Sequence, residues 1–463
     1  MAGRSKALSL LHTISSATCS CPAHSGGFLP LSTKAAKLTD YAFEMACSTV
    51  RYGPGVTKEI GQDVQALGAK KRYVITNKKV IKIYTFKTVM RNNSSNNRND
   101  TIFKEMVAEE ASVVFKKAID FARAGGFDAY VAVGGGSVMD TCKAANLYAS
   151  DPEADFLDYV NPPIGKGKPV TCSLSPLIAV PTTAGTGSET TGVAIFDYMP
   201  LKAKTGIANR ALRPSLGIID PLHTLLMPER VAAYSGFDVL CHALESFTAI
   251  PYNERSPCPE HPLLRPAYQG SNPISDVWAL HALRVLAKYF KRSVYDAGDV
   301  EARSQMHLAS CFAGVGFGNA GVHLCHGMSY PIAGNVKNFH PAEYELPHSV
   351  TSRGLAETAT LTGIFTTLNC VFMRDHSQSV QLRIQDVPTI IHNSGGLVLA
   401  DAVRELMVTM KVDNGLDSLG YTTEDIPALV KGTLPQHRVT KLAPREQSEE
   451  DLATLFENSM KVY

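Results

Sequence analysis

A short apolar run that leads directly into three glycines and a helical pattern is the feature that most constrains this chain. Tyr130–Val133 has the pattern of a buried strand, Gly134–Gly136 follows without a break, and Ser137 stands at the cap of the helical pattern. Glycines let an anion approach the backbone, and the first N–H groups and the dipole of a helix then hold it. The pattern predicts a phosphate-binding turn in preference to an ordinary strand-to-helix turn.

Strand and helix patterns alternate on both sides of this turn. Runs typical of strands occur at Arg72–Thr76, Leu177–Val180 and Leu216–Ile219, and Phe115–Ala124 carries apolar side chains on one helical face. Strands that alternate with helices imply a parallel sheet. Residues 45–225 are therefore predicted to form an α/β domain.

The pattern changes near residue 226. Helix-forming residues dominate residues 226–463, and Val277–Tyr289 and Glu301–Ala313 are typical of amphipathic helices. The predicted fold class is thus α/β plus all-α, with a helical second domain. Gly316–Gly321 matches the GxGxxG dinucleotide motif, but a helical pattern precedes it where a strand is required. We interpret these glycines as sites of close helix packing.

Two other segments carry loop predictions. Pro181–Thr191 follows the strand that ends at Val180, and its hydroxyls and small residues suit contact with ribose and pyrophosphate. Arg91–Asp100 is polar and low in complexity, which is typical of an exposed loop.

Histidines and one aspartate suggest a metal site. Asp238 and His242 are four residues apart in a helical pattern, so both lie on one face. Three further histidines, scarce in a chain with 14, follow at His323, His326 and His348. A carboxylate with imidazoles suits Fe(II) or Zn(II) and leaves room for a substrate oxygen. The nearby Cys241 and Cys325 are interpreted as core residues.

The amino terminus and the composition limit location and partners. Residues 1–39 are rich in serine, contain four Lys or Arg residues and lack Asp and Glu, which is typical of a mitochondrial transit peptide. The net charge of +2 argues against a nucleic-acid or acidic-membrane partner. No uninterrupted apolar run approaches ~18 residues, so no transmembrane helix is expected. The ten cysteines form no CxxC pair, so neither a zinc ribbon nor a disulfide scaffold is indicated.

Four motifs together give the chain a specific resemblance: GGGSVMDTCKAANL, PTTAGTGSETT, GFDVLCHALES and HLCHGMSYP. The chain resembles the iron-containing, or group III, alcohol dehydrogenases over residues 45–348 and again over 396–463. This implies a Rossmann-like domain and a helical domain, arranged as in dehydroquinate synthase, with NAD(H) and a divalent metal between them. The implied metal ligands are Asp238, His242, His326 and His348. The implied cofactor-binding residues are Asn77, Gly135, Gly136, Ser137, Asp140, Thr182, Thr183, Thr191 and Lys204.

The sequence departs from the family pattern at several places. Asn77 stands where many members carry the Asp that binds the adenosine ribose, which leaves NAD and NADP both open. The last ligand is usually followed by Gly but here by Ser349, so His340 or His323 remains an alternative to His348. Tyr330 stands where bacterial relatives often have a second histidine, and it is a candidate proton relay or a packing residue. Lys204 would act on the nicotinamide side.

The resemblance implies transfer of hydride from a hydroxyacid to an oxoacid through bound NAD. The implied pair is 4-hydroxybutyrate and 2-oxoglutarate, which give succinate semialdehyde and 2-hydroxyglutarate. An alcohol dehydrogenase with exchangeable NAD(P)H is one alternative. An inactive isoform is the other, because residues 79–114 and 349–394 do not read like the family. Homo-oligomer formation stays open.

Overall fold

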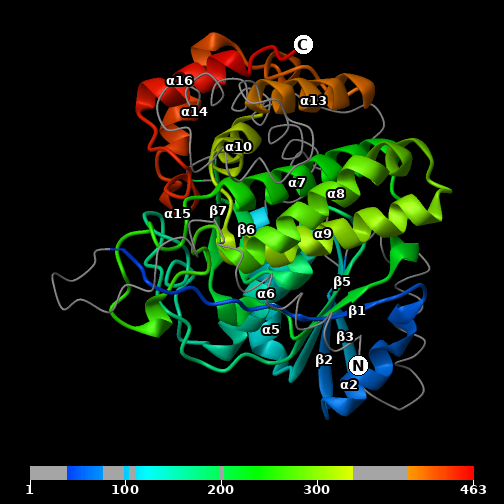
Figure 1. Cartoon of the computed structure of the whole chain (residues 1–463). Helices are drawn as coiled ribbons and strands as arrows, with labels where there is room; N and C mark the ends of the chain where they lie inside the picture. Colours follow the sequence, from blue (N-terminus) through cyan, green and yellow to red (C-terminus); the bar gives the residue numbers. More distant parts are fainter. Residues whose placement is uncertain (1–38, 77–98, 104–110, 199, 201–202, 337–394) are drawn as a thin grey trace, which may run out of the picture.

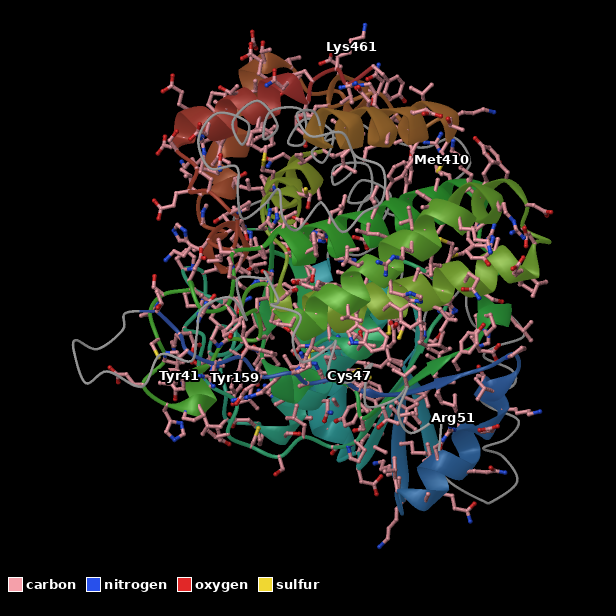
Figure 2. All side chains as sticks on the ribbon, in the orientation of Figure 1. Tyr41, Cys47, Arg51, Tyr159, Met410 and Lys461 are labelled. Atoms are coloured by element: carbon pink, nitrogen blue, oxygen red, sulfur yellow. The ribbon has the colours of Figure 1, made fainter. Side chains whose placement is uncertain are left out.

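The computed structural model describes residues 39–76, 99–103, 111–198, 200, 203–336 and 395–463. Predictions that fall on Asn77, His340, His348 and residues 1–38 lie outside these ranges. Figure 1 shows the sheet and its flanking helices at one end of the molecule and the last helices at the other. Figure 2 places Arg51 near the first end and Met410 and Lys461 at the second.

Six parallel strands form the main sheet in the order β1-β8-β5-β4-β2-β3. The strands are β1 Thr49–Tyr52, β2 Lys71–Thr76, β3 Asn99–Phe103, β4 Ala129–Gly134, β5 Leu177–Pro181 and β8 Leu216–Ile219. The predicted parallel sheet is confirmed. The loop prediction was wrong at its end, because Asn99 and Asp100 pair with β2 as the start of β3.

The alternation of side chains along β4 places the sheet between two layers. Val131 and Val133 point into a core shared with the first helices, η1 Val56–Glu59 and α2 Ile60–Ala66. Tyr130 and Ala132 point into the opposite core. That core is covered by α5 Ala111–Gly125 and α6 Gly136–Ser150. Every residue of β4 is buried, as expected for an inner strand of a parallel sheet.

A two-stranded antiparallel hairpin lies beside α6 and was not predicted. It pairs β6 Val193–Tyr198 with β7 Ala203–Ala208. Short 3-10 turns flank it and the last sheet strand. They are η3 Ser188–Thr190, η5 Arg210–Leu212 and η6 Pro221–His223.

The second half of the described chain is helical, as predicted. Its long helices are α7 Glu229–Thr248, α8 Pro273–Tyr295, α9 Val300–Ala320, α10 Leu324–Asn335 and α13 Gly395–Thr409. Its shorter elements are α14 Ile426–Thr433, α15 His437–Thr440, α16 Glu449–Asn458, η7 Pro262–Leu264, η8 Asp417–Leu419 and η9 Thr423–Asp425. One large apolar core joins α7, α8 and α9 to the helices near the carboxyl terminus.

The glycines of the GxGxxG match serve helix packing, as predicted. Gly316 and Gly318 lie inside α9, not after a strand. A Cβ atom at Gly316 would lie 3.2 Å from the carbonyl oxygen of Ser275 in α8. At Gly318 it would lie 3.3 Å from the Thr191 methyl group. Side chains at these positions would push neighbouring elements apart.

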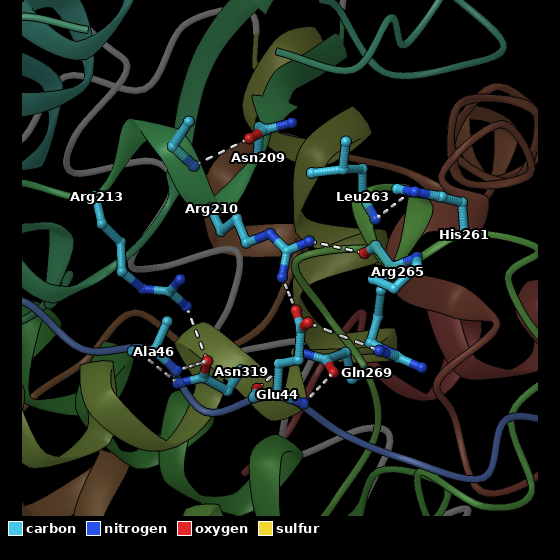
Figure 3. Close-up of polar contacts among 12 residues, drawn as sticks. Glu44, Ala46, Asn209, Arg210, Arg213, His261, Leu263, Arg265, Gln269 and Asn319 are labelled. Atoms are coloured by element: carbon cyan, nitrogen blue, oxygen red, sulfur yellow. Dashed lines mark hydrogen bonds and ion pairs between the residues drawn. The ribbon is translucent and has the colours of Figure 1, made fainter. Parts of the chain in front are cut away.

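The segment that precedes β1 is fastened to the helical part by two side-chain amides (Figure 3). Gln269 accepts a hydrogen bond from the Glu44 N–H at 2.7 Å and donates one to the Glu44 carbonyl at 3.0 Å. Asn319 binds Ala46 in the same two-sided way, at 3.0 and 2.9 Å. The Glu44 carboxylate also pairs with Arg210. These contacts tie the start of the sheet to α9.

No single helix in the described ranges is long and apolar enough to cross a membrane. The consecutive helices α9 and α10 meet that test only when taken together, and they meet at an angle of 102°.

Candidate active site

The predicted phosphate turn lies at the carboxyl end of β4. Gly135 is the N-cap of α6, and its backbone is extended. Since glycine has no side chain, no side-chain hydrogen bond caps the helix. Ser137 is therefore not the cap, as the sequence had suggested, but an exposed residue in the first turn of α6. The shift by two residues arises because glycine itself can occupy the cap. In the first turn of this 15-residue helix, Ser137 is exposed and Gly136 is half-buried, whereas Val138 is buried.

The second predicted loop lies directly against this turn. The Thr182 N–H donates to the Gly134 carbonyl at 3.0 Å. A Cβ atom at Gly136 would lie 2.7 Å from the Thr186 methyl group, and one at Gly135 would lie 3.5 Å from Thr183. The structure therefore brings the two loops together at the carboxyl ends of adjacent parallel strands, where α/β proteins bind nucleotides.

Asp140 and Thr191 take part in a buried network below these loops. The Asp140 carboxylate accepts from the Ser188 hydroxyl at 2.6 Å and from the Ile195 N–H at 2.9 Å. Lys143, one turn further along α6, donates to Ser188 at 2.7 Å and to Thr191 at 3.4 Å. Burial lowers the pKa of Lys143, and the Asp140 carboxylate opposes that shift. Lys143 was not predicted as a site residue, although it follows Asp140 at helical spacing.

Lys204 lies on β7, outside the two loops. It is buried and forms an ion pair with Asp197 on β6, with 2.5 Å between Nζ and Oδ1. Its carbonyl accepts from the Gln436 side chain at 3.2 Å, just before α15. The hairpin thus carries a paired cation toward the helical part of the molecule.

The predicted metal-binding residues of α7 and α10 converge. Asp238, His242 and His326 are all buried, and one candidate ligand atom from each lies within 4.8 Å of the others. Asp238 Oδ1 lies 3.5 Å from His242 Nε2 and 3.7 Å from His326 Nε2. Ligand bonds near 2.1 Å in tetrahedral geometry put ligand atoms roughly 3.4 Å apart. The residues therefore fit a divalent metal ion.

Glu245 fixes the orientation of His326, and the sequence analysis did not single it out. Its carboxylate accepts from the N–H groups of His323 at 2.9 Å, Cys325 at 2.8 Å and His326 at 3.3 Å. It also bonds to Nδ1 of His326, which leaves Nε2 to face Asp238. Burial acts to raise the pKa of Glu245, but the imidazoles of His326 and His323 outweigh it and hold the pKa below its usual value. Its position seven residues after Asp238, on the same face of α7, was the available signal.

Two other predictions near the metal group have clear outcomes. His323, an alternative ligand, does not join the group: its Nε2 lies 2.9 Å from the Thr248 hydroxyl. Burial lowers its pKa. Cys241 and Cys325 are fully buried parts of the apolar core, as predicted.

Contacts between elements connect the metal group to the two loops that follow β4 and β5, and to a pair formed by Tyr330 and Arg438. A Cβ atom at Gly185 would lie 2.8 Å from Ser235 Cβ, one helical turn before Asp238 on α7. On α10, the buried Tyr330 accepts a hydrogen bond from Arg438 at 3.0 Å. The loops, the metal group and Tyr330 therefore form one continuous region.

Family models match both halves of the chain. The model described as iron-containing alcohol dehydrogenase matches residues 47–221. The model for the C-terminal part of the Fe-containing alcohol dehydrogenase family matches residues 267–460. The chain belongs to the iron-containing alcohol dehydrogenase family. The resemblance that the motifs indicated is thus confirmed, and with it membership of a family of metal-dependent oxidoreductases.

Relatives in this family match the chain over its full length. It is 58% identical over 464 residues to the mitochondrial hydroxyacid-oxoacid transhydrogenase of Bos taurus, with 100% of both chains covered. It is 48% identical to the protein of the same name from Caenorhabditis elegans, with 96% of each chain covered.

Solved structures of the family share the fold. A 1,3-propanediol oxidoreductase is 24% identical, with a TM-score of 0.74, and the match covers 90% of this chain and 100% of that one. The sulfoacetaldehyde reductase of Bifidobacterium kashiwanohense, solved with NAD+, is 26% identical, with a TM-score of 0.70. That match covers 91% of this chain and 98% of the reductase. The predicted fold class is confirmed.

Proposed function

We propose that this chain is a mitochondrial hydroxyacid-oxoacid transhydrogenase that uses a divalent metal, Fe2+ or Zn2+, and NAD(H). The observation that carries the proposal is the buried group of Asp238, His242 and His326 beside a glycine turn. Full-length relatives of that name support it. In the proposed reaction, 4-hydroxybutyrate loses a hydride from its carbinol carbon and a proton from its hydroxyl. 2-Oxoglutarate gains both and becomes 2-hydroxyglutarate, and succinate semialdehyde is the other product.

The proposal assigns three residue sets. Asp238, His242 and His326 bind the metal, and His348 supplies the fourth ligand. Gly135, Gly136 and Ser137 hold the pyrophosphate, Thr182 and Thr183 line the dinucleotide site, and Asn77 faces the adenosine ribose. Asp140 and Thr191 shape that site through the Lys143 network. The assignment divides the chain into a transit peptide at 1–39, a Rossmann-like domain at 45–225 and a helical domain at 226–463.

The chain's own residues prepare the site for hydride transfer. Glu245 holds the imidazole of His326 in one orientation and one tautomer. The Tyr330 hydroxyl relays the proton that the substrate hydroxyl releases, and Lys204, paired with Asp197, lies on the nicotinamide side. Burial of the metal group keeps water from competing for the site. When bound, the metal supplies Lewis-acid polarisation and the nicotinamide supplies the hydride relay.

Assay of the purified mature chain without added cofactor tests the function. We expect 4-hydroxybutyrate and 2-oxoglutarate to react, with near one metal ion per chain by elemental analysis. Turnover that requires added NAD(P)H would favour an ordinary alcohol dehydrogenase. Absence of both metal and turnover would favour the inactive isoform.

Substitution of a proposed ligand tests the metal assignment. We expect His326→Ala to lose both metal and activity. His281→Ala changes an exposed histidine on α8 and serves as the matched control. Retention of metal and activity by His326→Ala would remove His326 from the ligand set.

A further inference from the structure

Arg438 brings a cation to the edge of the candidate active site. It lies on α15, and its Nη2 donates to the Tyr330 hydroxyl at 3.0 Å. Its guanidinium carbon lies 5.0 Å from the ring centroid of Tyr268. Its Nη1 is buried and has no hydrogen-bond partner among the described residues. Among the described residues, no carboxylate forms an ion pair with Arg438. An arginine side chain stays protonated, so this charge is left for another anion.

Two routes of contact place Arg438 beside the metal group. Along α10, Tyr330 follows His326 by one helical turn and so lies on the same face. A Cβ atom at Gly327 would lie 2.8 Å from the Thr440 methyl group, so α15 packs on α10 next to His326.

The second route runs through aromatic rings. The Phe317 ring stacks on His242 with 3.9 Å between centroids. The Tyr268 ring lies edge-on to Phe317, with 6.3 Å between centroids, and its other neighbour is the Arg438 guanidinium. Arg438 thus contacts Tyr330, one turn after His326 on α10, and Tyr268, which packs on the Phe317 ring that stacks against His242. This arrangement fixes the orientation of its planar guanidinium group, whose N–H donors fit the two oxygens of a carboxylate.

The two proposed substrates have the same spacing between the reacting carbon and a carboxylate, so one fixed cation can bind both. In 4-hydroxybutyrate, two methylene groups separate the reacting carbon from the carboxylate. In 2-oxoglutarate, two methylene groups separate the reacting carbonyl from the distal carboxylate. A single guanidinium at a fixed distance from the metal therefore fits the donor and the acceptor in turn.

We propose that Arg438 binds this shared carboxylate in both substrates, and that Tyr268 and Tyr330 position its guanidinium. The inference rests on the proposed function and assigns its substrate-specificity residue. It explains how the site would select hydroxyacids over simple alcohols, because an alcohol without the carboxylate leaves the buried Nη1 of Arg438 without a hydrogen-bond acceptor.

The donor half-reaction of the metal- and cofactor-loaded full chain tests the inference. Reduction of the bound nicotinamide is followed without acceptor, using either 4-hydroxybutyrate or 1-butanol as donor. Loss of a hydrogen bond to a charged group corresponds to about a 10- to 100-fold change in binding. We expect Arg438→Gln to raise the apparent KM for 4-hydroxybutyrate by that factor and to leave the apparent KM for 1-butanol unchanged. Loss of the hydrogen bond to Tyr330 changes the rate constant of reduction by the same factor for both donors, so only the difference in KM reports the carboxylate. Arg438→Lys should fall between Arg438→Gln and the wild type.

Two controls separate binding from folding. Arg445→Gln changes an exposed arginine seven residues further on, which pairs with Asp451, and should leave both donors unaffected. Metal content and thermal denaturation show whether Arg438→Gln is folded; if it is not, Arg438→Lys carries the test. An equal rise in the apparent KM for 4-hydroxybutyrate and 1-butanol, or no rise for either, would overturn the inference.

Binding of glutarate keeps this inference separate from the proposed function. Glutarate has the distal carboxylate but no group that can accept hydride. Calorimetry should show about 10- to 100-fold weaker binding to Arg438→Gln than to the wild type. If the wild type shows no turnover but binds glutarate more tightly than Arg438→Gln, the carboxylate site is supported and the proposed transhydrogenase function fails. If the wild type turns over but both proteins bind glutarate with equal affinity, the transhydrogenase function is supported and the Arg438 carboxylate site fails.

Discussion

At the residue scale, Glu245 controls the candidate metal site without being one of its proposed ligands. It bonds to His326 Nδ1 and caps α10 through three N–H groups. Loss of such a supporting carboxylate typically costs about 10- to 100-fold in metal affinity. We expect Glu245→Gln to lose metal by that factor in a chelator titration. Glu229→Gln, at an exposed position on the same helix, should retain it. Equal affinity in the two variants would contradict the role given to Glu245.

A second residue-scale prediction concerns pH. Burial raises the pKa of Glu189 from 4.5 to about 7, so the folded chain binds more protons than the unfolded chain between these values. Stability therefore falls as pH rises through this window, by about 3 kcal/mol in total. Glu189→Gln cannot ionise and should escape the loss. Denaturant unfolding at pH 5 and pH 8 measures the free energy of unfolding of both proteins. Glu189→Gln should be more stable than the wild type only at pH 8. Parallel pH profiles for the two proteins would contradict the prediction.

At the element scale, contact between the two cofactor loops sets the shape of the phosphate turn. A Cβ atom at Gly136 would lie 2.7 Å from the Thr186 methyl group and 2.9 Å from its hydroxyl. Gly136→Ala should therefore displace the second loop and lower the NAD(H) content of the purified protein at least about tenfold, a change of roughly 1.4 kcal/mol. Thr186→Ala removes both clashing atoms. The double variant should regain cofactor, and failure to do so would exclude a steric cause.

The elements that the sequence predicts correctly have strong local patterns. The runs that became β4, β5 and β8 are buried inner strands, and their apolar character is continuous. β1 and β3 are edge strands, with weaker patterns that depend on their neighbours. The β6–β7 hairpin was not predicted because its strands pair only with each other, outside the main sheet, and β6 is only partly buried.

The candidate site shows the same division between local and distant information. Asp238 and His242 are recognisable because four residues separate them on one helix. Glu245 and Arg438 act on residues 81 and 108 positions away in the sequence. Local spacing places Glu245 on the face of α7 that carries Asp238, but it does not reveal that His326 is the partner of Glu245 or Tyr330 the partner of Arg438. Only the fold brings these residues together.

At the scale of the whole molecule, Asn319 fastens the segment before β1 to the end of α9. Its buried side chain bonds to both the N–H and the carbonyl of Ala46, and it accepts from Arg213 at 3.0 Å. If residues 1–39 are removed as a transit peptide, this fastening lies only a few residues from the new amino terminus.

Replacement of Asn319 should therefore loosen the mature chain as a whole. Asn319→Ala removes the partner of the half-buried N–H and carbonyl groups of Ala46 and the acceptor of the Arg213 hydrogen bond, which together costs about 1–3 kcal/mol. For a chain of 463 residues we expect Tm to fall by about 1 °C per kcal/mol. Thermal denaturation measures the shift, and Asn253→Ala, at an exposed position, should not change Tm. An unchanged Tm in Asn319→Ala would mean that the segment before β1 contributes nothing to holding the sheet and the helices together.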